Sequence, residues 1–225
     1  MRGREDRAHE SIPLFVSRRL AQWALRLTFR LRVIGLEHVP RSGPVLVAGN
    51  HTGFLDGPVV MITLPRPAAI LIKSEIYHPP LSLVLDFAHQ IPVHRGTPDR
   101  TALTAGLRVL RSGGVLGMFP EGTRGTGQLA AIQHGIGYLA LHGSCPVVPV
   151  VCQGTAAALP KGKILPRWRA PIRVIFGPAF TVDVDGDPRA RTTIAAATEQ
   201  VRLGLLRHLE SIGADPQDVA EQRTA

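Results

Sequence analysis

The 225-residue chain is 44% hydrophobic, which suits one domain with its own core and an N-terminal extension, and excludes two full domains. Its formal net charge is +9, and only three of its 26 basic residues are lysines, so the charge comes mainly from arginine, which binds phosphate with a planar, two-pronged group. Because no helix-turn-helix, zinc-finger spacing or RNA-binding aromatic motif accompanies this charge, phosphorylated small molecules or anionic lipid are favoured over nucleic acid as partners.

The first predicted element is a helix from Ser11 to about Arg32. The charged residues 1–10 before it lack the apolar segment and cleavage site of a signal peptide, so export is not expected. Apolar residues recur every three or four positions and share one face of this helix; the stripe consists of Val16, Leu20, Trp23, Leu27 and Leu31. The arginines that project away from the stripe are Arg18, Arg19 and Arg26. Such a helix can lie in the surface of an anionic membrane, and an ordinary helix packed on the domain is the alternative.

Downstream, short apolar runs alternate with longer helical patterns. The predicted strands cover residues 45–48, 69–72, 90–94, 115–119, 147–151 and 172–176. The predicted helices cover residues 99–111, 129–142 and 192–209. This alternation predicts an α/β fold with a largely parallel central sheet flanked by helices. The expected organisation is an N-terminal membrane-contacting helix at 1–32, an α/β domain at 33–212 and a polar tail at 213–225.

Residues 125–160 contain no Lys, Arg, Asp or Glu, and on length alone they suffice to cross a bilayer. Gly and Pro interrupt them repeatedly, so a buried helix followed by a core strand is predicted instead of a membrane span. Cys145 and Cys152 flank or lie in that strand without metal-ligand spacing. They are therefore interpreted as free thiols in the core.

A histidine and an aspartate five positions apart, His51 and Asp56, follow the strand predicted at 45–48. A neutral histidine accepts a proton near pH 7, and a carboxylate on its other ring nitrogen fixes the orientation of the ring. The pair is interpreted as a general base with its orienting carboxylate. A buried histidine held by a nearby aspartate for structural reasons is the alternative.

Two further predicted strands end in polar blocks, His94-Arg95-Gly96 and Phe119-Pro120-Glu121-Gly122-Thr123-Arg124. Ligands bind at the carboxyl ends of strands in open α/β sheets, so Arg95 and Arg124 are expected to converge near His51 and to bind phosphate. Glu121 supplies a carboxylate that positions a substrate hydroxyl or an arginine, and Gly122 permits a tight turn. A solvated surface charge is the alternative for each arginine taken singly.

Together these blocks resemble the glycerolipid acyltransferase family, which includes bacterial 1-acylglycerol-3-phosphate (lysophosphatidate) acyltransferases, over about residues 33–180. His51 and Asp56 match the family's His-x4-Asp motif. The other matching residues are Arg95 of the second block, Glu121, Gly122 and Arg124 of the third, Val147, Val148 and Pro149 of the fourth, and Lys73 between the first two. The chain departs from the pattern at Gly53, where many members have Ser, and at Gln133-His134, where many have lysine.

The resemblance implies transfer of a fatty acyl group from acyl-CoA or acyl carrier protein to the free hydroxyl of 1-acylglycerol-3-phosphate, giving phosphatidate. It implies that His51 is the general base, that Asp56 orients it, and that Arg95, Arg124 and Lys73 hold the acceptor's phosphate. Backbone amides near Gly122 and Thr123 would stabilise the oxyanion. No acyl-enzyme, cofactor or metal is expected, because the chain lacks a Gly-x-Ser-x-Gly elbow and metal-ligand spacing.

Three alternatives stay open. The first is an acyltransferase with another acceptor, either glycerol-3-phosphate or another lysolipid or glycolipid, which the departure at Gln133-His134 allows. The second is a non-catalytic protein that binds anionic lipid, although such a protein would not need His51 and Asp56. The third is a thioesterase-like hydrolase, although such an enzyme would not need paired arginines. The expected location is the cytoplasmic face of the cell membrane, as a peripheral or monotopic protein, and the expected partners are a lysophospholipid, the acyl donor and an anionic membrane surface.

Overall fold

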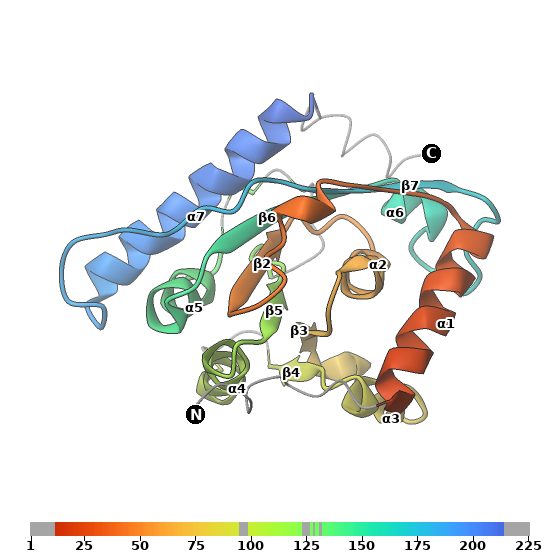
Figure 1. Cartoon of the computed structure of the whole chain (residues 1–225), viewed down its shortest axis with the longest axis horizontal. Coiled ribbons are helices and arrows are strands. Elements are labelled where there is room, and N and C mark those ends of the chain that lie inside the picture. The colour runs from red at the N-terminus through yellow and green to blue at the C-terminus, as the bar shows by residue number, and fades with distance from the viewer. Residues whose placement is uncertain (1–11, 95–98, 123–126, 128, 131, 214–225) are drawn as a thin grey trace, which may run out of the picture.

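The computed structural model describes residues 12–94, 99–122, 127, 129–130 and 132–213. Within these residues, seven strands form one sheet in the order β1-β7-β6-β2-β5-β3-β4 (Figure 1). Their bounds are β1 Arg30–Ile34, β2 Val45–Gly49, β3 Ala68–Lys73, β4 Ile91–Val93, β5 Val115–Met118, β6 Val147–Gln153 and β7 Pro171–Phe176. Neighbouring strands are parallel except β6 and β7. The predicted α/β fold with a largely parallel sheet is confirmed.

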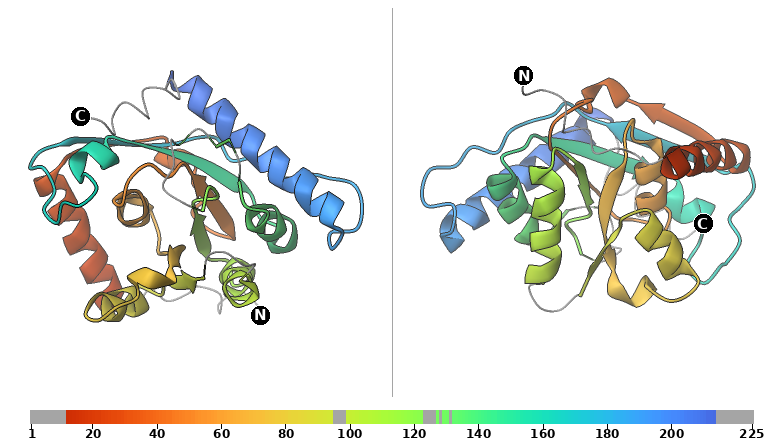
Figure 2. Two further views of the ribbon diagram at one scale, coloured as in Figure 1. Left: turned by 180° about the vertical axis from the view of Figure 1, so that it is seen from behind. Right: turned by 60° about the horizontal axis from the view of Figure 1, so that its bottom comes forward.

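Helices cover both faces of the sheet (Figures 1 and 2). Their bounds are α1 Ile12–Thr28, α2 Asp56–Thr63, α3 Leu81–Phe87, α4 Arg100–Arg111, α5 Gly135–Gly143, α6 Thr155–Ala158 and α7 Arg191–Ser211, with 3-10 turns at Leu36–His38 and Ser74–Ile76. Alternate residues of β2 enter different cores. Val45 and Val47 pack with residues of α2, whereas Leu46 and Ala48 pack with residues of α4, α5 and α7. Burial of both faces explains why the central strands are continuous apolar runs.

The N-terminal helix is shorter than the sequence predicted. It ends at Thr28, and Arg30–Ile34 is an edge strand parallel to β7. The prediction of a helix to about Arg32 is wrong. Leu31 fits the apolar spacing of the helix, but it also fits the alternation of inward and outward side chains in a strand. Leu31 and Val33 both pack on the core that contains α2. The sheet therefore begins before residue 33, and residues 1–11 of the predicted helical segment lie outside the described residues.

The other elements agree with prediction in kind. Each of the six predicted strands is present with its ends within two residues of expectation. The helix predicted at 129–142 begins only at Gly135, because Leu129 has a left-handed backbone with φ 54° that interrupts a helix. Cys145 and Cys152 are buried free thiols, as predicted, and burial raises the pKa of Cys145 to about 11. No helix among the described residues has the length and apolar character needed to cross a bilayer.

Candidate active site

The carboxyl ends of β2 and β5 meet at one edge of the sheet. The two strands are parallel, with Ala48 opposite Met118, so the segments that follow them emerge side by side. His51 follows β2, and Glu121 follows β5. The two residues are in direct contact, because the backbone N–H of His51 donates to Glu121 Oε1 over 3.1 Å. Two of the polar blocks singled out in the sequence thus form one site.

Asp56 is the first residue of α2 and is fully buried. Its Oδ2 atom lies 2.9 Å from His51 Nδ1 and accepts the backbone N–H groups of Thr52 and Gly53 over 2.7 and 2.8 Å. Its other oxygen accepts the hydroxyl of Thr155, at the start of α6. A carboxylate that accepts this many hydrogen bonds is held in one orientation.

The contact with Asp56 selects the tautomer of the neutral His51 ring. An ionised carboxylate only accepts hydrogen bonds, so the proton between the two side chains belongs to His51 Nδ1. The Nε2 atom is then the unprotonated nitrogen of the neutral ring and can take a proton from a substrate. The ring stacks on Phe119, with centroids 4.8 Å apart and planes at 30°, and the His51 side chain keeps 14% of its surface exposed. The imidazole is oriented and still accessible.

Glu121 is largely buried beside this pair. Burial raises its pKa above the ordinary value, and the charge of Asp56 acts in the same direction. The N–H groups of His51 and Gly127, together with the charge of His51, oppose this effect without cancelling it. After Glu121 the chain turns at Gly122, which has φ 68° and donates its N–H to Phe119 O over 3.1 Å. The predicted turn at Gly122 is confirmed.

Asn50 ties the end of β2 to β6. It accepts the N–H of Cys152 over 3.0 Å and donates its side-chain amide to the carbonyl of the same residue over 3.5 Å. This side-chain pairing, one residue beyond the end of β2, fixes the backbone that carries His51 to β6.

Both departures from the family pattern have a structural setting. A side chain at Gly53 would place its Cβ 2.8 Å from Ala156 N and 3.0 Å from the carbonyl carbon of Thr155, so serine does not fit there without a backbone shift. Gln133, which stands where lysine is common, donates its N–H to Pro120 O over 2.8 Å, and its side chain lies against Gly122. His134 is exposed at the start of α5. The second departure therefore lies beside the Glu121 turn.

The expected phosphate-binding residues are only partly described. Arg95, Thr123 and Arg124 lie outside the described residues. Lys73 ends β3 and forms an ion pair with Glu75, with Nζ 3.0 Å from Oε1 and both side chains more than a third exposed. A phosphate would compete with Glu75 for this lysine.

Sequence reasoning missed two residues that contact the His51–Asp56 pair, Thr155 and Phe119.

It also missed a second histidine and aspartate at the same spacing, His94 and Asp99, whose Nδ1 and Oδ2 atoms lie 3.1 Å apart. That second histidine side chain is 76% exposed. Asp99 is the N-cap of α4, because its Oδ1 accepts the N–H of Ala102 over 2.9 Å. This bond and one from the N–H of His94 lower the pKa of Asp99 to about 2. The spacing of five positions therefore does not distinguish a helix cap from a general base with its orienting carboxylate. The burial of Asp56 and the stacking of the His51 ring on Phe119 make that distinction.

Comparisons with known proteins identify the family of the chain. The family model described as Acyltransferase matches residues 30–153. The chain is 32% identical over 158 residues to a 1-acyl-sn-glycerol-3-phosphate acyltransferase of Limnanthes alba, covering 68% of this chain and 55% of that protein. It is 27% identical over 145 residues to the Bacillus subtilis protein of the same name, covering 62% and 72%. The chain thus spans about half the length of the plant relative.

A solved structure shares the fold. The crystal structure of the 1-acyl-sn-glycerophosphate acyltransferase PlsC from Thermotoga maritima superposes with a TM-score of 0.64 and 20% sequence identity. The match covers 90% of this chain and 80% of that one. The two chains therefore share a fold.

Proposed function

The chain belongs to the acyltransferase family, and we propose that it transfers a fatty acyl group from acyl-CoA or acyl carrier protein to the free hydroxyl of 1-acylglycerol-3-phosphate. The observation that carries the proposal is the His51–Asp56 pair, in which the carboxylate is buried with four donors and the imidazole stays accessible. Relatives named for this activity support the choice of acceptor.

The proposed reaction is a direct transfer. His51 Nε2 takes the proton of the acceptor hydroxyl as its oxygen bonds to the thioester carbonyl carbon. The carbon–sulfur bond then breaks, and the departing thiolate takes the proton that His51 carries. Asp56 stabilises the transient imidazolium and keeps Nε2 aimed at the hydroxyl. General base catalysis of this kind contributes about 10²- to 10⁴-fold.

The acceptor's phosphate is assigned to Arg95 and Arg124, with Lys73 as a third cation. The ends of β4 and β5, which precede the two arginines, lie at the same edge of the sheet as the end of β2. Backbone amides near Gly122 and Thr123 are assigned to the oxyanion, because the turn at Gly122 directly follows Glu121, which accepts the N–H of His51. In this assignment the N–H of Gly122 exchanges its bond to Phe119 O for one to the oxyanion. The loss of lysine at Gln133 keeps glycerol-3-phosphate or another lysolipid open as the acceptor.

We assign the protein to the cytoplasmic face of a membrane, and the N-terminal helix supports the peripheral part of this assignment. The middle of its predicted stripe points outward, with Leu20, Trp23 and Leu27 each more than 60% exposed. The opposite side of α1 attaches to the domain through Arg18, whose Nη2 donates to Leu64 O, and Gln22, whose Nε2 donates to Ile62 O, both over 2.9 Å. A cavity of about 320 Å³ lies between α1 and the end of α2. An apolar side that faces away from the protein suits lipid.

Thiol release from acyl-CoA tests the proposed activity. We expect release that depends on added 1-acylglycerol-3-phosphate, with phosphatidate as the product by mass. Release at the same rate without an acceptor would identify a hydrolase. No release with any lysolipid or with glycerol-3-phosphate, from either acyl-CoA or acyl carrier protein, would identify a silent lipid-binding protein.

A further inference from the structure

The segment between α6 and β7 carries three large apolar side chains that no other part of the described structure covers. Ile164 is 92% exposed, Leu165 81% and Trp168 71%. They lie in a loop, residues 160–169, that is termed the basic loop below. Single exposed apolar residues are ordinary on protein surfaces, whereas three within five positions form a patch that needs a partner.

Four cations flank these side chains, at Lys161, Lys163, Arg167 and Arg169. All four residues are exposed. Along the chain no Asp or Glu occurs between Glu121 and Asp183. Aliphatic side chains that enter the acyl boundary, a tryptophan at headgroup depth and lysines or arginines at the phosphates are the three components of interfacial lipid binding.

The basic loop is fixed to the end of α1. The N–H of Arg169 donates to Thr28 O over 2.6 Å, and its Nη1 donates to Arg26 O over 3.4 Å. The loop therefore lies at the C-terminal end of α1, next to the residue that follows Leu27, which is itself 61% exposed. Figures 1 and 2 show α1 with this loop at its C-terminal end and α3 near its N-terminal end. On α3, Leu83 and Val84 are 69% and 59% exposed.

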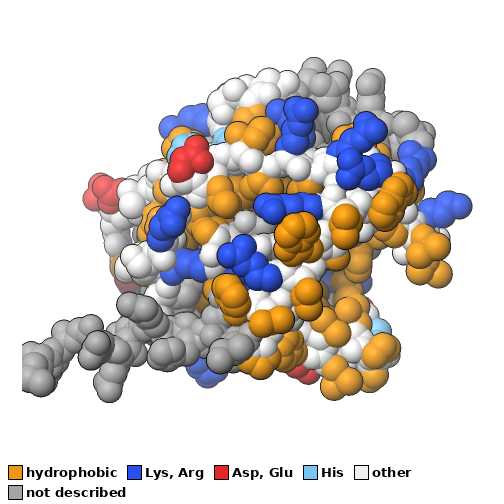
Figure 3. Space-filling model, turned by 45° about the vertical axis from the view of Figure 1, so that its right-hand side comes forward, with side chains coloured by type: hydrophobic (Ala, Val, Ile, Leu, Met, Phe, Trp, Pro, Cys, Tyr) orange, Lys and Arg blue, Asp and Glu red, His pale blue; other side chains and the backbone are white. Residues whose placement is uncertain are grey.

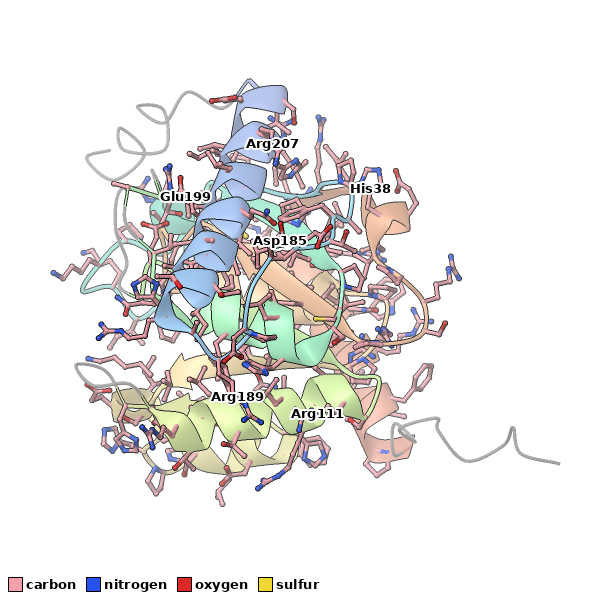
Figure 4. The ribbon with its side chains drawn as sticks, turned by 90° about the vertical axis from the view of Figure 1, so that its left-hand side faces the viewer. His38, Arg111, Asp185, Arg189, Glu199 and Arg207 are labelled. Carbon is pink, nitrogen blue, oxygen red and sulfur yellow. The ribbon has the colours of Figure 1, made fainter. Side chains whose placement is uncertain are left out.

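The two sides of the molecule differ in charge. Figure 3, with the side of α1 forward, shows hydrophobic side chains interleaved with Lys and Arg and few acidic side chains. Figure 4, from the other side, shows both signs on or beside α7, where Asp185, Glu199 and Arg207 are exposed. A protein partner for the first side would need a matching acidic surface, whereas an anionic bilayer supplies the negative charge and the apolar phase together.

We propose that the basic loop is a second membrane anchor, which inserts Ile164, Leu165 and Trp168 into the headgroup region of an anionic bilayer beside α1. The inference rests on the proposed membrane location of α1 and extends it to a segment more than 130 positions away along the chain. The loop also connects to the site, since α6, which precedes it, begins with the residue that bonds Asp56. A second anchor beyond the end of α1 restricts the tilt of the domain on the membrane more than the apolar side of α1 does alone.

Tryptophan fluorescence tests the anchor directly, because the chain has only two tryptophans. The variant W23F leaves Trp168 as the sole reporter, and W168F leaves Trp23 on α1. With phosphatidylcholine vesicles that contain phosphatidylglycerol, we expect a blue shift for Trp168 and quenching by lipids brominated on their acyl chains. A shift of Trp23 without one of Trp168 would overturn the second anchor and leave the location of α1 standing. No shift of either would overturn both.

A loop variant separates anchoring from folding and catalysis. I164S/L165S/W168S is expected to lower partitioning onto the anionic vesicles at least tenfold, since it removes three side chains that would leave water. Its activity on a monomeric short-chain 1-acylglycerol-3-phosphate should equal that of the parent. The control L203S removes an apolar side chain that is 44% exposed on α7 and should leave both properties unchanged. If the triple variant lost activity equally on monomeric and vesicle-bound acceptor, or if it turned a dimeric parent into monomers, the loop would not be a membrane anchor.

Discussion

Thr155 is the residue whose role depends most on tertiary structure. It is buried, and its hydroxyl donates to Asp56 Oδ1 across 99 positions of sequence. T155V keeps the shape of the side chain and removes this donor from a buried carboxylate, which costs roughly 1–3 kcal/mol. We expect a lower midpoint of thermal unfolding and a lower kcat, because the orientation of His51 depends on that carboxylate. T155S, which keeps the hydroxyl, should retain most of both, and equal effects of the two variants would contradict the role.

Glu121 links stability to pH. Burial raises its pKa, so the folded state holds the proton more tightly than the unfolded state. Between the unfolded and folded pKa values, the free energy of unfolding therefore falls as pH rises, and the cost of the buried charge is fully present above the folded pKa. E121Q removes that charge and keeps an acceptor for the N–H of His51. We expect this variant to be more thermostable than the parent at pH 7 and less active.

Thermal unfolding from pH 4 to pH 8 checks this prediction. The gain in stability of E121Q over the parent should shrink as pH falls toward the ordinary glutamate range. A gain that stays constant or grows toward pH 4 would show that the carboxylate is not held at a raised pKa.

The candidate site was predictable where its contacts are local in sequence. His51 and Asp56 are five positions apart, so a turn at the start of α2 brings them together, and strand order brings Glu121 to the same edge. Thr155 carried no such signal, because its partner is known only once α6 is placed. The second pair, His94 and Asp99, shows the converse, since the same spacing there serves a helix cap.

At the scale of elements, the prediction of strands succeeded because both faces of the sheet are buried. The N-terminal helix illustrates where periodicity fails. An apolar residue at position 31 fits both the apolar stripe of a helix and the alternating burial of a strand. Only the pairing of β1 with β7 shows that this segment is a strand. The short helices α3 and α6 carry too few turns for a periodic signal.

Packing between α5 and α7 supplies a stability prediction. A Cβ at Gly137 would lie 2.3 Å from Thr198 Oγ1 and 2.6 Å from Ile194 O, both on α7. G137A should force the helices apart and lower the free energy of unfolding by about 1–3 kcal/mol. In G135A, at the start of the same helix, the new atom meets only the side-chain ends of Leu103 and Met118, at 3.3 and 3.5 Å. We expect little change there by chemical denaturation, and equal losses in the two variants would contradict this packing.

At the scale of the whole molecule, the net charge of +9 and the uncovered side of α1 predict salt-dependent binding to anionic membranes. The variant L20S/W23S/L27S should lose most of its co-sedimentation with phosphatidylglycerol vesicles and keep its thermal stability, since these side chains are exposed in the folded protein. High salt should weaken the binding of the parent. A parent that sediments equally with neutral and anionic vesicles at every salt concentration would contradict the electrostatic part of this account.

The measurement that bears most directly on the account is the rate of phosphatidate formation from acyl-CoA and 1-acylglycerol-3-phosphate by the parent, H51A and H94A. In both histidines the Nδ1 atom lies close to Oδ2 of an aspartate five positions later in the sequence, at 2.9 and 3.1 Å. Only His51 is assigned as the base. The account predicts that H51A loses about 10²- to 10⁴-fold in kcat while H94A stays close to the parent. An H51A rate equal to that of the parent would contradict it.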